Sequence, residues 1–378
     1  MEKQIRILNV TTVFKAAGIE SFIMNMYRHI DRTKVQFDFM VMRNEKEFYD
    51  EEIKALGGRK YTINISAGNV FIKVIKESME LYRFLKKNPY EIIHIHYTTP
   101  LRAFYLLAAK KAGVRTRIYH SHSAEVSGKS GMKRLIYNWL KKGIEAWGTH
   151  YFACSEVAAQ WMFSQDILTA KRYRVIYNGI DVNKFKFNLE DRKAVRQELG
   201  IEDKYVVIHT GRFLEQKNHR FIVEVFKELK SKYSKAYLLF LGTGDLFESI
   251  GQLVKQHGLE KDVCFLGVRP DVNRYLNAAD CYIMPSLYEG LPVAAVEAEC
   301  ADLPCVFSTN ITDEVALTER VTFLQLDEPV TKWCDVLLGY RNLDRRNVSE
   351  KIAERGYAVK SVAQALQKFY IDENGEQG

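Results

Sequence analysis

Short apolar runs alternate with amphipathic stretches along the whole chain. The runs predict strands, and the stretches with apolar residues at helical spacing predict helices. The expected strands are Ile5–Val10, Phe37–Met42, Lys60–Ile63, Ile92–His96, Arg117–Ser121, His150–Cys154, Arg174–Tyr177, Tyr205–His209, Ala236–Leu241, Val263–Leu266, Cys281–Met284, Pro304–Phe307 and Thr322–Leu326. The expected helices are Ile19–Ile30, Val70–Lys87, Pro100–Ala112, Asn218–Lys232, Leu246–His257, Val272–Ala278, Leu291–Ala301 and a last one from Val359. Such alternation is typical of α/β folds with parallel sheets.

The pattern divides the chain into two parts. Its 378 residues, 47% of them apolar, are enough for two domains that each bury a core. The stretch from Asn178 to about Asp191 is polar, turn-forming and poor in strands, which predicts a hinge. We therefore expect an N-terminal domain of residues 1–183, onto which a final helix in residues 359–372 packs back, and a C-terminal domain of residues 184–358. A cleft between two such domains is a common ligand site.

Composition excludes several classes of protein. Charged residues make up 27% of the chain, and no apolar run is long enough to span a membrane. The first residues lack the apolar region of a secretory signal. The six cysteines contain no C-x-x-C pair, which is typical of a reducing compartment and not of a disulfide framework or a zinc site. These features predict a cytoplasmic protein.

The net charge of +8 is unevenly distributed. Residues 1–180 carry 29 Lys and Arg against 16 Asp and Glu, whereas the remainder carries 26 against 31. A basic half indicates an anionic partner, and nucleic acid, an anionic membrane or a phosphorylated substrate would each fit. Ordinary solvated surface charge is the competing interpretation. Because the chain has no recognition helix or basic-aromatic module, we expect no nucleic-acid binding.

The segment Pro285–Glu297 carries the most chemistry. It follows a predicted strand, and Pro292 stands where a helix has its first residue. The backbone N–H groups of Gly290 and Leu291 would then lie at the positive end of that helix, which suits a phosphate. Glu289 and Glu297 would accept hydrogen bonds from the hydroxyls of a sugar and a ribose. Taken alone, two glutamates on a helix are usually only solvated.

A second motif, Gly211–Asn218, follows the strand predicted at Tyr205–His209. Its Arg212 and Lys217 stand where ligands bind in α/β sheets, and together they can neutralise a diphosphate. A basic loop with surface ion pairs is the competing interpretation. No D-x-D pair for a nucleotide-bound Mg²⁺, no P-loop and no complete G-x-G-x-x-G motif occurs in the chain. We therefore expect cationic side chains to neutralise the ligand, with no metal and no other cofactor.

The N-terminal half adds a glycine and a group of histidines. Gly18, after the first strand, permits a close approach of a ligand at a helix start. His94 and His96 lie on one predicted strand, and His120 and His122 on the next. Metal binding is one interpretation of the four. Simple packing is the other, since no carboxylate or cysteine accompanies them at ligand spacing. We expect His122, at the end of its strand, to face a ligand.

These motifs together resemble those of one enzyme family. An E-x7-E motif at Glu289–Glu297, a G-R-x4-K-N motif at Gly211–Asn218, the segment Asn178–Asp181 and the segment Gly18–Glu20 occur in the family's order and spacing. The chain resembles the retaining glycosyltransferases of family 4, closest in character to bacterial capsule and exopolysaccharide enzymes. The resemblance implies the GT-B fold, in which two Rossmann-like domains face each other across a cleft. One departure is Ala17, where the family has a first loop glycine.

The resemblance also implies a role for individual residues. Arg212 and Lys217 would hold the donor diphosphate, Glu289 the sugar hydroxyls and Glu297 the ribose, with His122 near the donor sugar. The implied catalytic residues are Arg212, Lys217, Glu289 and His122, and the implied donor-binding residues are Gly18, Gly211, Val268, Arg269, Gly290, Leu291 and Glu297. Main-chain groups of Gly267, Val268 and Arg269 would meet the nucleobase.

The implied reaction moves a hexose or N-acetylhexosamine from a UDP-sugar to a saccharide acceptor, lipid-linked, in cell-surface polysaccharide synthesis. Residues 131–147 combine apolar, aromatic and cationic residues at helical spacing, which predicts contact with the inner face of the cell membrane. An amphipathic helix packed on its own domain is the equal alternative for this segment. The alternatives for the whole chain are a nucleotide-sugar epimerase, a glycoside phosphorylase and a non-catalytic nucleotide-sugar-binding protein.

Overall fold

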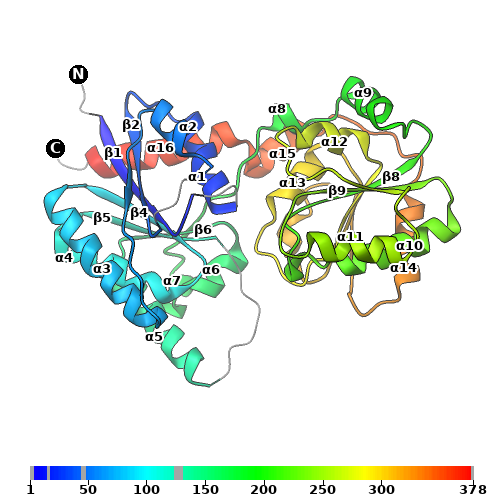
Figure 1. Ribbon diagram of the computed structural model, residues 1–378. Helices are drawn as coiled ribbons and strands as arrows, with labels where there is room; N and C mark the ends of the chain where they lie inside the picture. Colours follow the sequence, from blue (N-terminus) through cyan, green and yellow to red (C-terminus); the bar gives the residue numbers. More distant parts are fainter. Residues whose placement is uncertain (1–3, 15–17, 44–47, 123–130, 376–378) are drawn as a thin grey trace. The chain divides into compact units, whose positions relative to one another are not determined.

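The computed structural model describes residues 4–14, 18–43, 48–122 and 131–375, of which Met132 and Lys133 are described by backbone alone. The chain forms two compact units (Figure 1). Unit 1 consists of residues 1–179 and 359–378, and unit 2 of residues 180–358. The division falls at residues 179 and 180, where the sequence predicted residues 183 and 184.

Unit 1 is built around a parallel sheet of seven strands among the described residues. The strands are β1 (Ile5–Thr11), β2 (Val35–Val41), β3 (Lys60–Thr62), β4 (Ile92–Tyr97), β5 (Thr116–Ser121), β6 (His150–Ala153) and β7 (Arg174–Val175). They lie in the order β3-β2-β1-β4-β5-β6-β7. The order reverses direction between β1 and β4, and such a reversal opens a ligand crevice at the carboxyl ends of the strands.

Two layers of helices bury the faces of this sheet (Figure 1). The helices of unit 1 are α1 (Gly18–His29), α2 (Asp50–Ala55), α3 (Val70–Lys87), η1 (Pro100–Arg102), α4 (Ala103–Ala112), α5 (Met132–Trp147), α6 (Glu156–Met162), α7 (Gln165–Thr169) and α16 (Val359–Gly375). The helices α1, α2 and α16 share one apolar core, and α3 to α7 share the other. Val359, Leu366 and Tyr370 of α16 are buried in the first core, so the last helix of the chain completes unit 1.

Unit 2 repeats this plan with six parallel strands among the described residues. The strands are β8 (Tyr205–Thr210), β9 (Ala236–Leu241), β10 (Val263–Phe265), β11 (Cys281–Met284), β12 (Cys305–Ser308) and β13 (Val321–Leu324). The helices are α8 (Val182–Phe185), α9 (Leu189–Leu199), η2 (Glu215–Lys217), α10 (His219–Lys232), α11 (Phe247–Gln256), α12 (Val272–Ala278), α13 (Val293–Cys300), η3 (Asp313–Val315), α14 (Val330–Gly339), α15 (Ser349–Ile352) and η4 (Ala353–Tyr357). The sheet order is β10-β9-β8-β11-β12-β13, which places the reversal between β8 and β11.

The predicted α/β class is confirmed, and each unit has Rossmann-like topology. Every expected strand is present, with ends shifted by at most two residues. The prediction was wrong at α9, which begins at Leu189 within the segment assigned to a strand-poor hinge. Asn188 caps this helix by accepting from the N–H groups of Glu190 and Asp191. Within the described ranges, no helix combines the length and apolar character that a bilayer crossing requires.

Candidate active site

The carboxyl end of β8 borders the reversal of the unit 2 sheet, and the residue that follows the neighbouring strand β9 is a glycine for a steric reason. Gly242, after the neighbouring β9, has a φ of +131°, and a Cβ there would lie 2.0 Å from the carbonyl oxygen of Gly211. The N–H of Gly211 donates to Leu241, and the N–H of Gly242 donates to Gly267 at the end of β10. Glycines therefore follow three adjacent strands, and at Gly242 the close approach of the chain after β8 leaves no room for a side chain.

The loop after β8 presents the two predicted cations in different surroundings. Arg212 is exposed, and its guanidinium has no partner among the described residues. Lys217 is mostly buried, with 16% of its side chain exposed, at the end of η2. Asn218 follows in the left-handed conformation, with a φ of 54°, and begins the turn into α10. Arg212 is thus free to bind an anion, whereas Lys217 is held in place.

The loop after β11 is attached to the loop after β8. Gln216 donates from Nε2 to the carbonyl of Tyr288 at 2.9 Å and accepts from the N–H of Leu287 at 2.8 Å. Asn218 donates from Nδ2 to the carbonyl of Pro285 at 3.2 Å. The two motifs singled out in the sequence are therefore brought together at the reversal of the sheet, the position at which α/β folds bind ligands.

Lys217 and Glu289 form an ion pair across these loops. The Nζ of Lys217 lies 2.7 Å from Oε1 of Glu289, and only 9% of the Glu289 side chain is exposed. A nearly buried carboxylate requires a compensating charge, and Lys217 supplies it. The residue predicted to hold phosphate and the residue predicted to hold sugar hydroxyls are therefore neighbours, a contact that the sequence did not predict.

The helix after this loop begins at Val293, two residues after the expected start at Leu291 and one after Pro292. Pro292 is not the first helical residue but precedes α13, because its ψ of 116° is extended. Its carbonyl accepts from the N–H of Ala295 at 3.0 Å, which leaves Val293 and Ala294 as the first free N–H groups of the helix. Gly290 and Leu291 lie in the buried loop before the helix. Sequence reasoning missed the amides of Val293 and Ala294 because it started the helix too early.

Glu297 lies in the middle of α13 and is partly exposed. Burial raises the pKa of its carboxyl group to about 7, and the charge of Lys184 opposes this shift. The second carboxylate of the E-x7-E motif is therefore close to half-protonated at neutral pH. Glu289 lies before the helix and Glu297 within it.

The edge predicted to meet a nucleobase lies after β10. Val268 is 65% exposed, and its main-chain groups form no hydrogen bond with any described residue. The guanidinium of Arg269 donates to both carboxylate oxygens of Asp271 at 3.0 Å and lies over the ring of Tyr275, 5.1 Å from its centroid. Arg269 is therefore held in place by its own loop, and the free main chain of Val268 is the available recognition group.

In unit 1, the predicted residues also lie at the reversal of the sheet. Gly18 is the first residue of α1, after β1, and a Cβ there would meet nothing within 4 Å. Ala17 lies outside the described residues. His122 directly follows β5 and is partly exposed. Burial lowers its pKa to about 3, so its imidazole is neutral at physiological pH.

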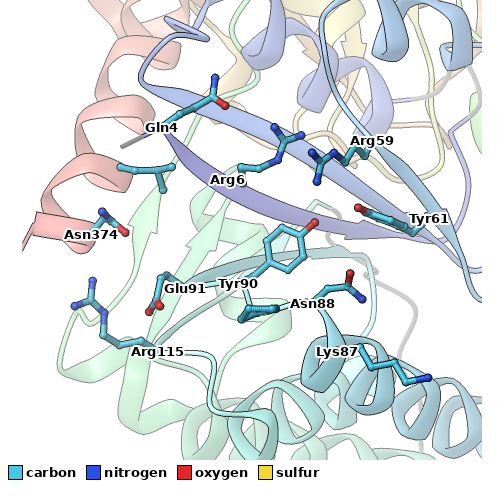
Figure 2. Close-up of a pocket in the computed structure, with 12 residues that line it drawn as sticks. Gln4, Arg6, Arg59, Tyr61, Lys87, Asn88, Tyr90, Glu91, Arg115 and Asn374 are labelled. Carbon is cyan, nitrogen blue, oxygen red and sulfur yellow. The ribbon is translucent and has the colours of Figure 1, made fainter. Parts of the chain in front are cut away.

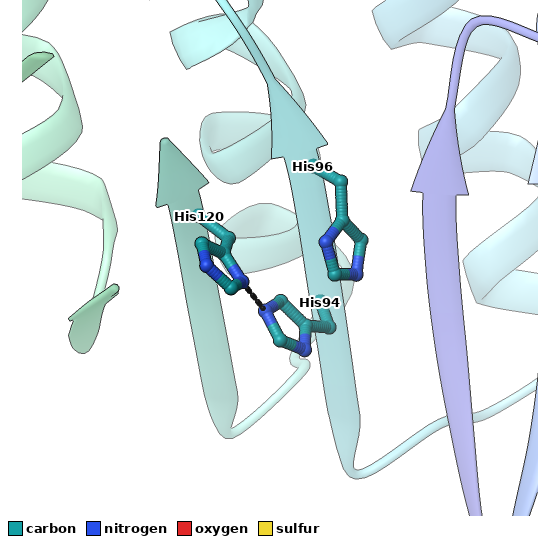
Figure 3. A group of neighbouring side chains, drawn as sticks. All are labelled: His94, His96 and His120. Carbon is teal, nitrogen blue, oxygen red and sulfur yellow. Dashed lines mark hydrogen bonds between the residues drawn. The ribbon is translucent and has the colours of Figure 1, made fainter. Parts of the chain in front are cut away.

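The other three histidines, on β4 and β5, are buried (Figure 3). Their ligand atoms lie within 4.8 Å of one another, which is close enough to surround a metal ion. However, the rings of His94 and His96 stack at 4.0 Å, whereas two imidazoles sharing one metal direct their ring planes toward it. His94 and His120 also share a hydrogen bond of 3.2 Å between Nε2 and Nδ1. Packing and mutual hydrogen bonding therefore describe the cluster better than coordination does.

A basic hollow of about 560 Å³ lies at the opposite edge of the unit 1 sheet (Figure 2). Arg6, Arg59, Lys87 and Arg115 line it, with Tyr90 at its centre. The guanidinium of Arg6 is paired with Asp38. Because it borders the amino ends of β1, β4 and β5, this hollow is separate from the predicted site residues.

Comparison with known proteins identifies the family. The model of glycosyltransferase family 4 matches residues 16–184, and that of group 1 glycosyl transferases matches residues 191–317. EpsF of Bacillus subtilis, described as a glycosyltransferase, is 35% identical over 97% of this chain and 96% of its own. The chain belongs to glycosyltransferase family 4. The predicted resemblance is thereby confirmed.

Other similar proteins include a relative that transfers galactose and two solved structures. An Escherichia coli galactosyltransferase, which takes UDP-Gal and GlcNAc-diphosphoundecaprenol, is 26% identical over 98% of this chain and 97% of its own. The crystal structure of HepE from Anabaena in complex with UDP superposes with a TM-score of 0.76 at 17% identity, covering 97% of this chain and all of that one. WaaG, a glycosyltransferase of lipopolysaccharide biosynthesis, superposes with a TM-score of 0.73 at 15% identity, covering 97% and 99%. The predicted GT-B fold is confirmed.

Proposed function

We propose that this glycosyltransferase transfers a hexose or N-acetylhexosamine from a UDP-sugar to a saccharide acceptor, with retention of the anomeric configuration. The observation that carries the proposal is the reversal of the unit 2 sheet, where Arg212, whose guanidinium has no partner in the part of the chain that the structure describes, lies in the loop that also carries Lys217. A guanidinium and an ammonium next to free helix amides suit a diphosphate. A solved structural neighbour, HepE, binds UDP, which supports UDP as the nucleotide.

Different groups of the protein bind the diphosphate, the base and the sugars of the donor. Arg212, Lys217 and the N-terminal amides of α13 hold the diphosphate, and the main chain of Val268 meets the base. Glu289 accepts from sugar hydroxyls and Glu297 from the ribose. Lys217 already neutralises Glu289 at 2.7 Å, so the diphosphate of the donor shares the Lys217 ammonium with that carboxylate. The sugar hydroxyls then donate hydrogen bonds to Glu289 and replace part of the solvation that its carboxylate lost on burial.

In the proposed transfer, the bond between the anomeric carbon and the diphosphate oxygen breaks, and a bond from that carbon to the acceptor oxygen forms on the same face. The acceptor proton passes to the leaving diphosphate. The cations stabilise the charge that develops on the leaving group. Such electrostatic stabilisation is usually the largest single contribution to catalysis. This scheme uses no metal and no other cofactor.

We further propose that the acceptor saccharide is lipid-linked and that the enzyme works in cell-surface polysaccharide synthesis. The related galactosyltransferase of Escherichia coli acts on a diphosphoundecaprenol-linked sugar, which supports this choice. An acceptor anchored in a bilayer requires the enzyme to approach the membrane.

One surface of unit 1 suits such an approach. The rings of Phe71 in α3 and Phe104 in α4 lie 5.7 Å apart, and those of Phe104 and Trp139 in α5 lie 6.0 Å apart, so three helices share one aromatic surface. Leu135 and Trp139 are 63% and 55% exposed. Apolar side chains also remain exposed along α3 at Val70, Ile72, Ile75, Met79 and Tyr82. With exposed cations such as Lys142 beside them, these helices match a surface that contacts anionic lipid.

The test measures release of the nucleoside diphosphate by the full chain: UDP from UDP-galactose, UDP-glucose and UDP-N-acetylglucosamine, and GDP or ADP from GDP-mannose and ADP-glucose for comparison. Each is assayed with and without undecaprenyl-diphosphate-linked N-acetylglucosamine. We expect release from a UDP-sugar that requires the acceptor, and an α-linked product by NMR. Interconversion of the sugar without an acceptor would identify an epimerase, and binding without release would identify a non-catalytic protein. Either result would overturn the proposal.

A further inference from the structure

The four histidines of unit 1 form two separate hydrogen-bonded chains across β4 and β5. Along each strand the rings stack, with centroids 4.0 Å apart both for His94 and His96 and for His120 and His122. Across the strands the rings are joined by hydrogen bonds, of 3.2 Å between His94 and His120 and of 2.9 Å between His96 and His122. The strand register places His96 opposite His120, so each of these hydrogen bonds joins residues offset by two positions. Figure 3 shows the bond between His94 and His120.

One chain leads from the sheet interior to the candidate active-site histidine. The Oδ1 of Asn9, on β1, lies 3.1 Å from Nε2 of His96. The Nδ1 of His96 lies 2.9 Å from Nε2 of His122. Asn9 and His96 are both buried, whereas His122 is partly exposed at the carboxyl end of β5. The Nδ1 of His122 has no hydrogen-bond partner among the described residues.

The positions of the protons along this chain follow from the donor and acceptor roles of each group. Burial lowers the pKa values of His96 and His122, so each ring is neutral and carries one N–H. A carbonyl oxygen only accepts, so Nε2 of His96 donates to Asn9 and Nδ1 of His96 is a lone pair. His122 must then donate from Nε2, and its own Nδ1 is left as a lone pair.

The second chain ends at a buried histidine and not at a partly exposed one. Tyr370 of α16 lies with Oη 2.6 Å from Nδ1 of His94, and Nε2 of His94 lies 3.2 Å from Nδ1 of His120. The chain stops at Nε2 of His120, which is buried and has no partner among the described residues. This chain stabilises the packing of α16 and provides an internal control for the first.

We propose that Asn9 and His96 are positioning residues that hold His122 as the Nε2–H tautomer, so that its Nδ1 lone pair accepts a hydrogen bond from a hydroxyl of the donor sugar. The proposal rests on the proposed function, since it assigns His122 to the sugar of the UDP-sugar. A fixed tautomer matters because the wrong one presents a donor where an acceptor is required.

The first experiment needs no substrate. The full chain is labelled with ¹⁵N-histidine, and ¹⁵N NMR reports which ring nitrogen of His122 carries the proton, with H122F to assign its signals. We expect a protonated Nε2 and an unprotonated Nδ1. The Nδ2 of Asn9 has no partner among the described residues, and an amide turned by 180° would reverse every donor in the chain. A protonated Nδ1 would therefore overturn the proposal.

The second experiment measures turnover of the UDP-sugar that the wild type uses. We expect H96L to lower kcat by about 10²-fold, because partners that orient an active-site imidazole commonly contribute this much. H96N, whose Oδ1 stands near the place of Nδ1, should restore most of that loss. H94L, on the same strand and equally buried, should keep kcat within about threefold of the wild type.

UDP affinity separates a positioning role from a structural one. UDP has no sugar, so its Kd should stay within about twofold of the wild type in H96L. Equal losses of kcat in H96L and H94L, or a matching loss of UDP affinity in H96L, would mean that the cluster only stabilises unit 1 and would overturn the catalytic part of the proposal. If no UDP-sugar turns over at all, the proposed function fails, whereas the NMR result still decides which tautomer His122 adopts.

Discussion

The two sheets have the same topology, yet the reversal of strand order carries opposite chemistry in each. In unit 2 the edge between β8 and β11 holds an exposed guanidinium, a buried ion pair and a helix N-terminus. In unit 1 the edge between β1 and β4 lies next to imidazoles whose pKa values burial lowers, so they carry no charge at neutral pH. A shared fold therefore does not determine the ligand, because side chains at the strand ends do.

The difference suits the two parts of the donor that we propose, a nucleotide sugar. A diphosphate requires positive charge, and fixed cations supply it with little reorganisation. A sugar hydroxyl is neutral, and a neutral imidazole with a fixed tautomer supplies a directed hydrogen bond without attracting the diphosphate. The predictions below test this division of roles, from the largest expected effect to the smallest.

The largest effect is expected at Arg212. R212M should lower kcat/KM for the UDP-sugar by about 10²-fold or more, since it removes the exposed charge that we propose stabilises the leaving group. K255M removes an exposed cation of α11 and serves as the matched control, with kcat/KM expected within about twofold of the wild type. Comparable losses in both variants would mean that overall charge matters and the position of Arg212 does not.

The Lys217–Glu289 pair tests whether the charged edge also affects stability. K217M leaves a nearly buried carboxylate without its partner, so we expect a free energy of unfolding lower by about 3 kcal/mol, measured by urea denaturation. K217M/E289Q removes both charges and should recover most of that stability while remaining inactive. A double variant no more stable than K217M would contradict the pairing.

Glu297 predicts a pH dependence. Its folded pKa of about 7 lies above the ordinary 4.5, so the folded state binds this proton more tightly than the unfolded state. The stability that Glu297 contributes is complete below about pH 4.5 and is lost as the pH rises through 7. E297Q should therefore have a higher Tm than the wild type at pH 8, and the difference should shrink at pH 5. A constant difference across this range would contradict the raised pKa.

The smallest effect is expected at the aromatic surface of α5. L135A/W139A should reduce sedimentation of the protein with phosphatidylglycerol vesicles by a few fold, because two exposed apolar side chains are lost. UDP affinity, which depends on unit 2, should not change. Vesicles of phosphatidylcholine should bind both proteins weakly. Unchanged binding to the anionic vesicles would contradict the proposal that this surface contacts anionic lipid.

The sequence predicted the strands well because buried parallel strands read as short apolar runs, and most of the helices between them because their apolar faces recur at helical spacing. It predicted no helix at α2, at α6 to α9, at α14 or at α15. Of these, α9 is mostly polar, and few of its side chains, such as Val195, are fully buried. The prediction started α13 too early because proline suits the first turn of a helix by its φ, and ψ at Pro292 cannot be read from residue type.

The sequence predicted which residues form the candidate site, but it did not predict the contacts between them. Lys217 and Glu289 were each assigned to a ligand, and only the folded chain shows that they bind each other. The histidines were placed on neighbouring strands, yet the pairing of His96 with His122 depends on register and on ring rotation. Asn9 was not singled out, because a lone asparagine in a strand carries no signal in the sequence.

The most direct test of the account compares the binding of uridine and UDP by isothermal titration calorimetry, in the wild type and in R212M. The account predicts that UDP binds the wild type at least about tenfold more tightly than uridine, because the diphosphate meets the cations of unit 2. In R212M most of this advantage should disappear, while uridine affinity stays the same. Equal affinities for uridine and UDP in the wild type, or an unchanged advantage in R212M, would contradict it.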